Sequence, residues 1–436
     1  MFSKPSVFSK IILILYWLTI FIFLYRNSIF TEIKGPAFET SPGELYLFLF
    51  LFSFFGIVLW YLISNNHLEL KILKLTVLLT FTSLLFVKPF FSQDIYWNLL
   101  HSKNFVHDIN PYINKPVDYE TDSLLSLLKI WEDFPMTHGP LNVYLYAIPY
   151  LFTDNLHLVL ISLRLIWFLV LISSAKYVFD NMQDNNVKYI FLTSPFVLIN
   201  TVLDLHNDVF VVLSLALSYY FLKRNMHNAA FISLLPGVLI KYVTLVIIPA
   251  ILINWIKSSG LKIKTILHIT GVLIISALIV ILFYLPFTKE INNINVLFTG
   301  LNIQANFYFP QRQFIISYLL LDNQIITPTI LKVVGFIVGM ILGIVLIIKK
   351  KPEEAYIFSP GILILSSSWL MPWYFIWIMP FILIRYKNIF TNVLYATFTL
   401  IPLSFIALSI IYSTTIPFII SIKYALKNMR SKSNEL

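Results

Sequence analysis

Residues 91–141 hold seven of the 21 acidic residues of the chain and form its only long polar interval. Within them, Asp94, Asn98 and His101 are spaced at i, i+4 and i+7, which places all three on one face of a helix. Ser92 can cap that helix, and Asp94 would then stand in its first turn, where the helix dipole favours a carboxylate. A carboxylate with an amide and an imidazole beside it is suited to taking a proton from a substrate hydroxyl. The alternative is an interfacial helix with a solvated polar face.

A second polar cluster occupies five consecutive positions between two apolar runs. It contains Asp204, His206, Asn207 and Asp208. Two carboxylates, an imidazole and an amide are costly next to lipid, which favours a functional turn over a solvated external loop. Asp204, His206 and Asp208 could supply oxygen and nitrogen ligands to a divalent metal, although we expect none to be required.

A lysine interrupts a long apolar run. Lys241 lies inside Phe231–Trp255, where an ammonium is costly unless it faces a cavity or an anion. The preceding Pro236-Gly237 is expected to break the helix and to free backbone amides, and a phosphate could satisfy both the lysine and the amides. Arg312 is an external cation that could bind the same phosphate in a bidentate manner. The alternative for Lys241 is a side chain that snorkels to the interface.

Two shorter motifs fall in or next to the polar interval. Tyr112 follows Asn110-Pro111, a pair that favours a turn, and it can anchor at the membrane interface. His138 would stand at the N-terminus of a helix that begins at Pro140, and Gly139 between them lets a ligand approach the backbone. For both motifs an ordinary structural role is the alternative.

The aromatic run WLMPWYFIW covers residues 369–377 and includes Trp373 and Tyr374. Such a run is typical of an aromatic belt at a membrane interface. It could also form the wall that binds a polyisoprenoid chain.

The elements that position these residues must be membrane helices. Of the 436 residues, 58% are hydrophobic and 12% are charged, and the mean hydropathy is +0.81, which indicates an all-α polytopic membrane protein. A transmembrane barrel is excluded because the apolar runs are about 15–25 residues long and do not alternate. The absence of cysteine excludes disulfides and thiolate chemistry. The net charge of +10 does not indicate nucleic-acid binding, because the basic residues fall in short loops between apolar runs.

We expect about 12–14 transmembrane helices with additional external interfacial helices. The apolar runs lie near 11–30, 44–63, 70–90, 157–179, 188–203, 207–223, 228–256 (two half-helices are an option here), 264–287, 326–349, 355–369, 373–385 and 389–412. Positively charged loops face the cytoplasm, so the N-terminus is expected there and the 91–138 loop outside. This layout places 20 of the 31 Lys and Arg residues in cytoplasmic loops. It requires that Pro140–Phe152 form a re-entrant or interfacial helix that does not cross.

The chain is predicted to be one transmembrane domain, 1–436. Its parts are three N-terminal spans (1–90), a first large external catalytic loop (91–138), a re-entrant helix with the central spans (139–287), a second external loop (288–325), and C-terminal spans with a cytoplasmic tail (326–436). The external loops and the turns at 204–208 and 369–373 would then meet on one membrane face, around a cavity open to the outside.

The order of these motifs resembles the GT-C glycosyltransferases, and most of all the polyprenol-phosphate-mannose-dependent mannosyltransferases. The resemblance covers roughly 90–385 and rests on Asp94, Tyr96, Asn110, Pro111, Tyr112, Gly139, Pro140, Leu141, His206, Asn207, Asp208, Lys241, Tyr242, Pro372, Trp373 and Tyr374. It implies a GT-C-like bundle and an inverting transferase with a lipid-phosphate sugar donor and an external active site. In that family an aspartate of the first external loop is the catalytic base, which corresponds to Asp94.

We therefore expect a glycosyltransferase that moves mannose or another hexose from a polyprenyl-phosphate donor to a hydroxyl of a glycan or glycolipid acceptor. Asp94 would be the base, and Lys241 and Arg312 would bind the donor phosphate. The expected substrate-binding residues are Asn98, His101, Tyr112, His138, His206, Asn207, Asp208, Tyr242, Trp373 and Tyr374. No cofactor is expected, because the leaving group is a single phosphate on a lipid.

Other classes of membrane protein make different demands on the sequence. A lipid-linked saccharide flippase or secondary transporter, the main alternative, needs polar residues across the midplane and repeated halves. Here the acidic residues cluster on one face and no clear repeat is present. A structural subunit would leave Lys241 unexplained. We expect the protein in a bacterial plasma membrane, with its N-terminus in the cytoplasm and its active site outside.

Overall fold

The computed structural model describes residues 7–29, 42–65, 67–89, 92–119, 122–128, 131–180, 186–289, 297, 303, 306, 320–321, 324–368 and 370–385. All regular elements within these ranges are helices, so the all-α prediction is confirmed. Five of these helices are long and apolar enough to cross a membrane, or six if one bent pair counts as a single span. The predicted polytopic membrane architecture is therefore confirmed as well.

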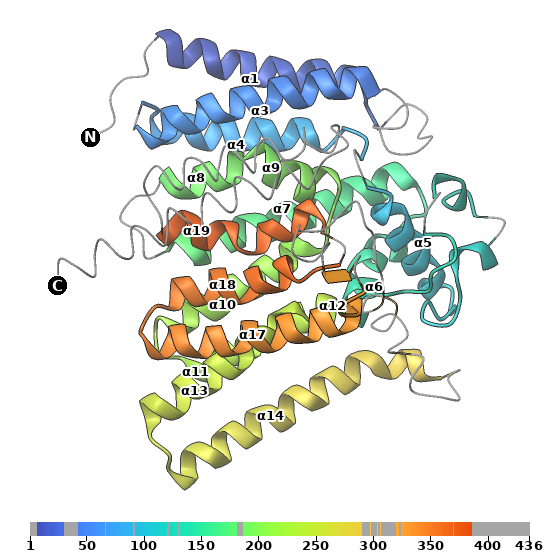
Figure 1. Ribbon diagram of the computed structural model, residues 1–436. Coiled ribbons are helices and arrows are strands. Elements are labelled where there is room, and N and C mark those ends of the chain that lie inside the picture. Colours follow the sequence, from blue (N-terminus) through green and yellow to red (C-terminus); the bar gives the residue numbers. More distant parts are fainter. Residues whose placement is uncertain are drawn as a thin grey trace.

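The first three helices form one flank of the bundle (Figure 1). They are α1 (Val7–Arg26), α3 (Pro42–Ser64) and α4 (Leu70–Leu84). Phe23 of α1 stacks on Phe48 of α3, with 3.9 Å between ring centroids. Phe81 of α4 stacks on Phe168 of α7 (Leu156–Phe179) at 3.5 Å, which attaches this flank to the central helices.

A broken span packs against α3 and α4 of this flank. It consists of α8 (Asn186–Thr193), α9 (Pro195–Leu198) and η4 (Ile199–Leu203), and it bends by 51° at its break. The end of a helix leaves backbone carbonyls that lipid cannot satisfy. The guanidinium of Arg164, fully buried on α7, donates to the carbonyls of Val202 (3.1 Å), Leu203 (3.2 Å) and Leu85 (2.8 Å). This one side chain therefore stabilises the end of the broken span where the 204–208 turn begins.

The run at 228–256, for which either one span or two half-helices was expected, is divided into four pieces. They are α11 (His227–Ile232), α12 (Leu235–Lys241), η5 (Val243–Ile247) and α13 (Ile248–Ser259). Pro236 lies in the first turn of α12, where proline is tolerated. The helix ends instead at Tyr242, whose φ of 58° is left-handed. The structure thus has a break at Ser233-Leu234, directly before the predicted Pro236-Gly237, and a second, unpredicted break at Tyr242, the residue after Lys241.

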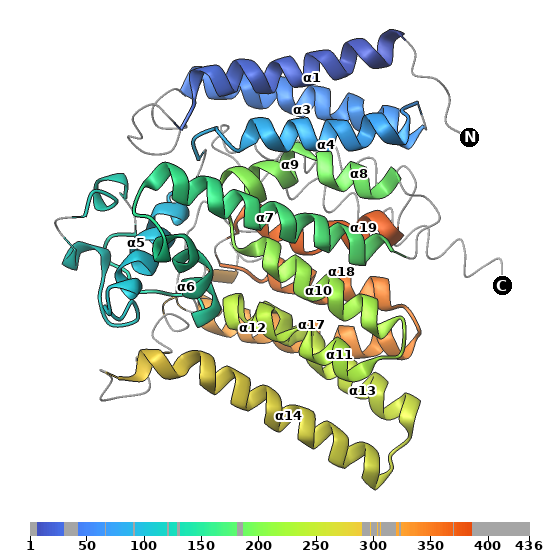
Figure 2. The same ribbon diagram turned by 180° about the vertical axis from the view of Figure 1, so that it is seen from behind.

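Residues 92–155 form a compact subdomain at one end of the bundle, visible from both sides (Figures 1 and 2). It contains α5 (Asp94–Val106), η1 (Pro116–Asp118), η2 (Leu125–Leu127), α6 (Pro140–Ala147) and η3 (Ile148–Leu151). The eight residues of α6 extend about 12 Å, whereas a crossing helix needs about 20 residues. Asn110 Nδ2 donates to the Phe287 carbonyl at 2.7 Å and joins this subdomain to the membrane helices.

Helix α14 (Ile263–Tyr284) forms the flank opposite α1 (Figure 2). Few of its side chains are buried within the protein: those of Thr265, Val272, Ser276 and Tyr284. Contacts near its two ends attach it to the bundle, among them a hydrogen bond from the Tyr144 hydroxyl to the Phe283 carbonyl at 3.1 Å. Tyr284 and Tyr242 share a hydrogen bond between their hydroxyls (2.6 Å), and Asn228 Nδ2 lies 2.7 Å from His268 Nε2.

The remaining helices are α10 (Asp208–Leu222), α17 (Pro328–Ile348), α18 (Pro352–Leu365), η8 (Pro372–Trp377) and α19 (Met379–Arg385). Gly335, Gly339 and Gly343 form a small-residue seam along α17 that allows α18 to approach closely. A Cβ on Gly339 would lie 2.8 Å from Val246 Cγ2 and 2.9 Å from the Ser359 carbonyl. The seam therefore fixes how α17 sits against its neighbours.

Candidate active site

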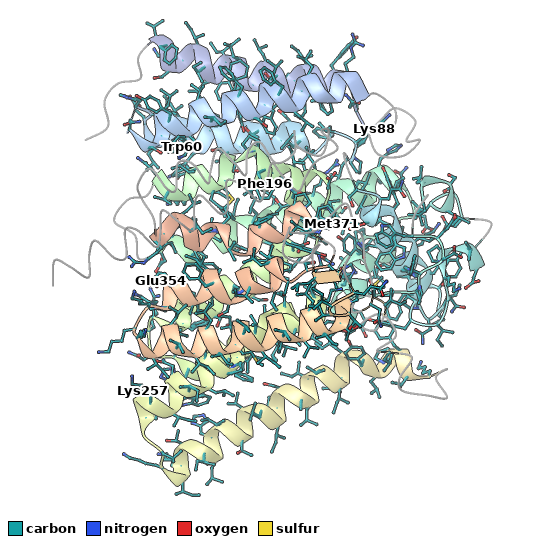
Figure 3. All side chains as sticks on the ribbon, in the orientation of Figure 1. Trp60, Lys88, Phe196, Lys257, Glu354 and Met371 are labelled. Atoms are coloured by element: carbon teal, nitrogen blue, oxygen red, sulfur yellow. The ribbon has the colours of Figure 1, made fainter. Side chains whose placement is uncertain are left out.

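A cavity of about 340 Å³ lies between the 92–155 subdomain and the ends of α12, α17, α18 and η8. Figure 3 shows Met371, one of its lining residues, toward the end of the bundle that bears α5, whereas Glu354 and Lys257 lie at the far end. The polar side chains of its wall are mainly Asp94, His138, Lys241, Lys332, Ser366 and Ser367. The aromatic ones are Trp97, Trp131, Tyr242, Phe336, Trp373, Tyr374 and Trp377.

Asp94 occupies the first position of α5, as predicted, and the Ser92 hydroxyl accepts a hydrogen bond from its backbone N–H at 3.1 Å. Its side chain is 21% exposed, into the cavity, and His206 Nδ1 lies 3.8 Å from Asp94 Oδ2. Burial raises the pKa of Asp94 above its usual 3.8, although Lys241 opposes that shift. A carboxylate whose pKa is moved toward neutrality is a better general base than an ordinary one.

Three buried asparagines connect α5 to the 204–208 turn. Asn207 Nδ2 donates to Asn142 Oδ1 at 2.6 Å, and Asn142 Nδ2 donates to Asn98 Oδ1 at 2.7 Å. Asn98 Nδ2 in turn donates to the backbone carbonyl of Asp94 at 2.7 Å. We call these three residues the amide chain. It links three segments that are far apart in the sequence.

Lys241 forms an ion pair with Asp208, a partner that its position in the sequence does not reveal. Lys241 Nζ lies 2.6 Å from Asp208 Oδ2, and Trp377 Nε1 donates to Asp208 Oδ1 at 2.7 Å. The ring of Tyr374 lies 5.4 Å from the ammonium, within the range of a cation–π contact. The charge of Lys241 is therefore compensated by Asp208 while one side of the ammonium still faces the cavity.

The 204–208 turn has a strained backbone that side chains from other helices hold in place. Leu205 has a left-handed φ of 53°, which a branched side chain rarely adopts. Its carbonyl accepts a hydrogen bond from the Tyr146 hydroxyl, and the next carbonyl, of His206, accepts one from Trp167 Nε1 at 2.9 Å. The His206 ring stacks on Trp373 at 3.7 Å. Strain of this kind persists where the surrounding structure over-determines it, which is common at functional sites.

Two predicted substrate-binding residues have structural partners inside the 92–155 subdomain. His101 is fully buried, and its Nε2 lies 3.3 Å from the Phe134 carbonyl. Burial lowers the pKa of His101 to about 4, so its ring is neutral. The Tyr112 hydroxyl donates to the His138 carbonyl at 2.8 Å. Burial also lowers the pKa of His138, whose side chain does line the cavity.

The predicted site residues thus divide into three groups. Those that line the cavity are Asp94, His138, Lys241, Tyr242, Trp373 and Tyr374. Those that lie behind the wall, bonded or stacked onto other residues as described, are Asn98, His101, Tyr112, His206, Asn207 and Asp208. Arg312 lies outside the described residues.

Among the residues of this region that were not predicted as site residues are Asn142, Trp131, Lys332 and Trp377, the last of which lies in the aromatic run 369–377. Lys332 stands near the start of the apolar run 326–349, and the same argument that selected Lys241 would have selected it. Asn142, two residues after Pro140, had no spacing signal of its own. Its importance depends on partners 44 and 65 positions away.

The metal option at Asp204, His206 and Asp208 receives no support from the geometry. Across the described ranges, no three His, Asp or Glu side chains lie close enough together to hold a metal ion. Asp208 is instead committed to Lys241 and Trp377.

Comparison with known proteins gives one match. Residues 26–257, slightly more than half of the 436-residue chain, match the sequence family described as Alpha-(1->6)-mannopyranosyltransferase, N-terminal domain. This range includes Asp94, the amide chain, the 204–208 turn and Lys241. No curated protein and no solved structure shows a match.

Proposed function

Because the chain belongs to the alpha-(1->6)-mannopyranosyltransferase family of glycosyltransferases, we propose that it transfers a hexose, mannose in the first instance, from a polyprenyl-phosphate donor to an acceptor hydroxyl. The observation that supports this most is the composition of the cavity. A carboxylate, two lysines and an apolar aromatic wall line one space of about 340 Å³. The donor has matching parts: a sugar, one phosphate and an apolar chain.

In the proposed reaction, Asp94 accepts the proton of the acceptor hydroxyl while the hydroxyl oxygen bonds to the anomeric carbon. The bond from that carbon to the phosphate oxygen breaks on the opposite face, so the anomeric configuration inverts. Polyprenyl phosphate leaves with one more negative charge than the phosphodiester had. Its departure is therefore assisted by cations placed where that charge develops.

Two lysines of the cavity wall are available for that role. Lys241 faces the cavity with Asp208 as its counter-ion, and Lys332 enters the cavity from the first turns of α17. Lys332 thus places a second ammonium group at the cavity, beside that of Lys241. Arg312 remains a candidate from the 288–325 loop, outside the described residues.

The walls of the cavity fit the other parts of the donor. Phe336, Leu363 and Met371 form an apolar side next to Lys332, which suits the first isoprene units. His138 and Trp131 lie on the α5 side with Asp94, where sugar and acceptor hydroxyls would bind. His206 and Asp208 act from behind the wall, through Trp373 and Lys241.

We place this site on the external face of a plasma membrane, with the N-terminus in the cytoplasm and 91–138 as the catalytic loop of a single transmembrane domain. The positive charge of the predicted cytoplasmic loops supports this orientation. Lys257, assigned to one of those loops, lies at the end of the bundle opposite α5 (Figure 3).

The test is a transfer assay with purified protein, labelled polyprenyl-phosphate hexoses, and glycan or glycolipid acceptors. Asp94→Asn keeps the size of the side chain and removes its basicity, so we expect a loss of at least about 10²-fold in turnover with donor binding retained. Asp204→Asn and Asp208→Asn should cost less turnover. Asp118→Asn is the matched control, because Asp118 is an exposed carboxylate of the same loop that caps Lys115 N–H at 2.6 Å.

Two outcomes would refute the proposal. If Asp94→Asn transfers sugar at the parental rate while Asp208→Asn is inactive, the base lies in the 204–208 turn. If the protein moves the intact lipid-linked sugar across a vesicle membrane without cleaving it, the protein is a flippase or transporter.

A further inference from the structure

The geometry points to Asn142 as a positioning residue: we propose that its amide holds the carboxylate of Asp94 in place relative to the 204–208 turn. This inference rests on the proposed function, because it takes Asp94 as the group that receives the proton. Asn142 itself does not line the cavity, so any effect on the reaction must pass through the residues it binds.

Asn142 is the middle member of the amide chain and uses both ends of its side chain. Its Oδ1 accepts from Asn207 at 2.6 Å and its Nδ2 donates to Asn98 at 2.7 Å. All three amides are almost completely excluded from solvent. Water therefore cannot replace a lost hydrogen bond unless the site rearranges. If the Asn142 amide were removed, Asn98 and Asn207 would each keep a buried polar atom without a hydrogen-bond partner.

The two ends of the chain are attached to the groups that would perform the reaction. At one end, Asn98 Nδ2 bonds the backbone carbonyl of Asp94 at 2.7 Å, which fixes the first turn of α5. At the other end, Asn207 lies between His206, whose Nδ1 is 3.8 Å from Asp94 Oδ2, and Asp208, the counter-ion of Lys241. Asn142 thus sets the separation between the base and the cationic part of the cavity.

The Asn142 amide is important here because it joins two segments that lie far apart in the sequence. Asn98 and Asn207 come from segments that are separated in sequence by an entire membrane helix and a broken span. A displacement of about 1 Å between reacting groups can cost about 10²-fold in rate. Loss of the Asn142 contacts should therefore reduce turnover more than it reduces donor affinity.

The experiment measures kcat and donor KM for Asn142→Asp and Asn142→Leu, each alone and in an Asp94→Asn background. Asn142→Asp keeps the shape and can still accept from Asn207, but it cannot donate to Asn98. We expect kcat to fall by about 10–10²-fold with donor KM changed less than about threefold. In the Asp94→Asn background, either substitution should lower the remaining rate less than about threefold, because its effect passes through Asp94.

Ser218→Ala is the matched control for a lost buried hydrogen bond. Ser218 is fully buried, and its hydroxyl lies 2.7 Å from that of Tyr356, remote from the cavity. It should change neither kcat nor KM. If Asn142→Leu does not fold, Asn98→Ala interrupts the same chain one step closer to Asp94 and is expected to show the same dependence on Asp94.

The outcomes separate this inference from the proposed function. An Asn142→Asp protein with parental kcat would overturn the inference alone, provided that Asp94→Asn is impaired. An equal loss in both backgrounds would show that Asn142 only supports the fold, which also overturns it. A parental rate for Asp94→Asn would overturn the proposed function first, and the inference with it.

Discussion

The ion pair between Lys241 and Asp208 should be worth several kcal/mol to the fold, and Asp208→Asn is the substitution that tests this. The Asp208 side chain is 0% exposed and that of Lys241 is 11% exposed. Two unit charges 2.6 Å apart attract by about 6 kcal/mol at an effective dielectric constant of about 20. Desolvation offsets much of this attraction, and removal of one partner from a buried pair costs about 3–5 kcal/mol.

That free energy converts into a measurable change of unfolding temperature. With an unfolding entropy of about 2.1 cal/mol/K per residue, a chain of 436 residues loses about 4 °C for a loss of about 4 kcal/mol. We expect this fall for Asp208→Asn and for Lys241→Met, each measured by thermal unfolding of the purified protein. Because the double variant leaves neither charge buried without its partner, it should lose no more than either single variant, and not about 8 °C.

The matched control is Asp180→Asn. Asp180 Oδ2 lies 2.7 Å from Arg224 Nη2, so the contact is as short, but the two side chains are 37% and 33% exposed. An exposed pair contributes about 0–1 kcal/mol, so the shift should stay below about 1 °C. If the Asp208→Asn and Lys241→Met losses add up in the double variant, the two residues do not act as a pair and the reasoning is wrong.

Four other measurements test the remaining features. Gly339→Ala should lower the unfolding temperature, since overpacking costs about 1–3 kcal/mol, whereas Gly271→Ala, with nothing within 4 Å of the new Cβ, should not; equal effects would contradict the seam. Lys332→Ala should raise donor KM, and an unchanged KM would remove Lys332 from the phosphate site. The transfer rate should fall as the pH drops through the raised pKa of Asp94, so its acid limb should lie above 3.8 and disappear in Asp94→Asn; a limb at the ordinary carboxyl pKa would oppose this assignment. Cysteines placed at Ser123 and Ser258 should differ in labelling by an impermeant thiol reagent in intact cells, and equal labelling would overturn the topology.

The helices could be predicted because lipid forces each span to satisfy its own backbone. The run predicted at 157–179 is helix α7 at Leu156–Phe179, and that at 264–287 is α14 at Ile263–Tyr284. The break at Tyr242 was not predicted, because it depends on packing and not on a local signal. The Gly139 N–H donates to the Ile240 carbonyl at 2.9 Å, and a Cβ on Gly139 would collide with the Leu239 carbonyl.

Part of the candidate site followed from the sequence and part did not. Periodicity placed Asp94, Asn98 and His101 on one helical face, but it could not say what covers that face. In the structure Asn142 bonds Asn98, and the Phe134 carbonyl lies next to His101. Of the three predicted residues, only Asp94 therefore reaches the cavity. The pairing of Lys241 with Asp208, 33 positions apart, is a tertiary contact that no spacing rule contains.

Because α14 is largely exposed, the tilt of this helix should depend on the thickness of the membrane. The apolar stretch Ile263–Thr288 has 26 residues, about 39 Å of helix, whereas a bilayer has a hydrocarbon core of about 30 Å. Such a helix is accommodated by tilting, and a thicker or thinner bilayer changes the tilt. Tyr284 near the end of α14 is bonded to Tyr242, the residue after Lys241. A change of lipid length would therefore shift the end of α14 at the edge of the cavity, where Tyr284 bonds Tyr242 and the Tyr144 hydroxyl donates to the Phe283 carbonyl at 3.1 Å.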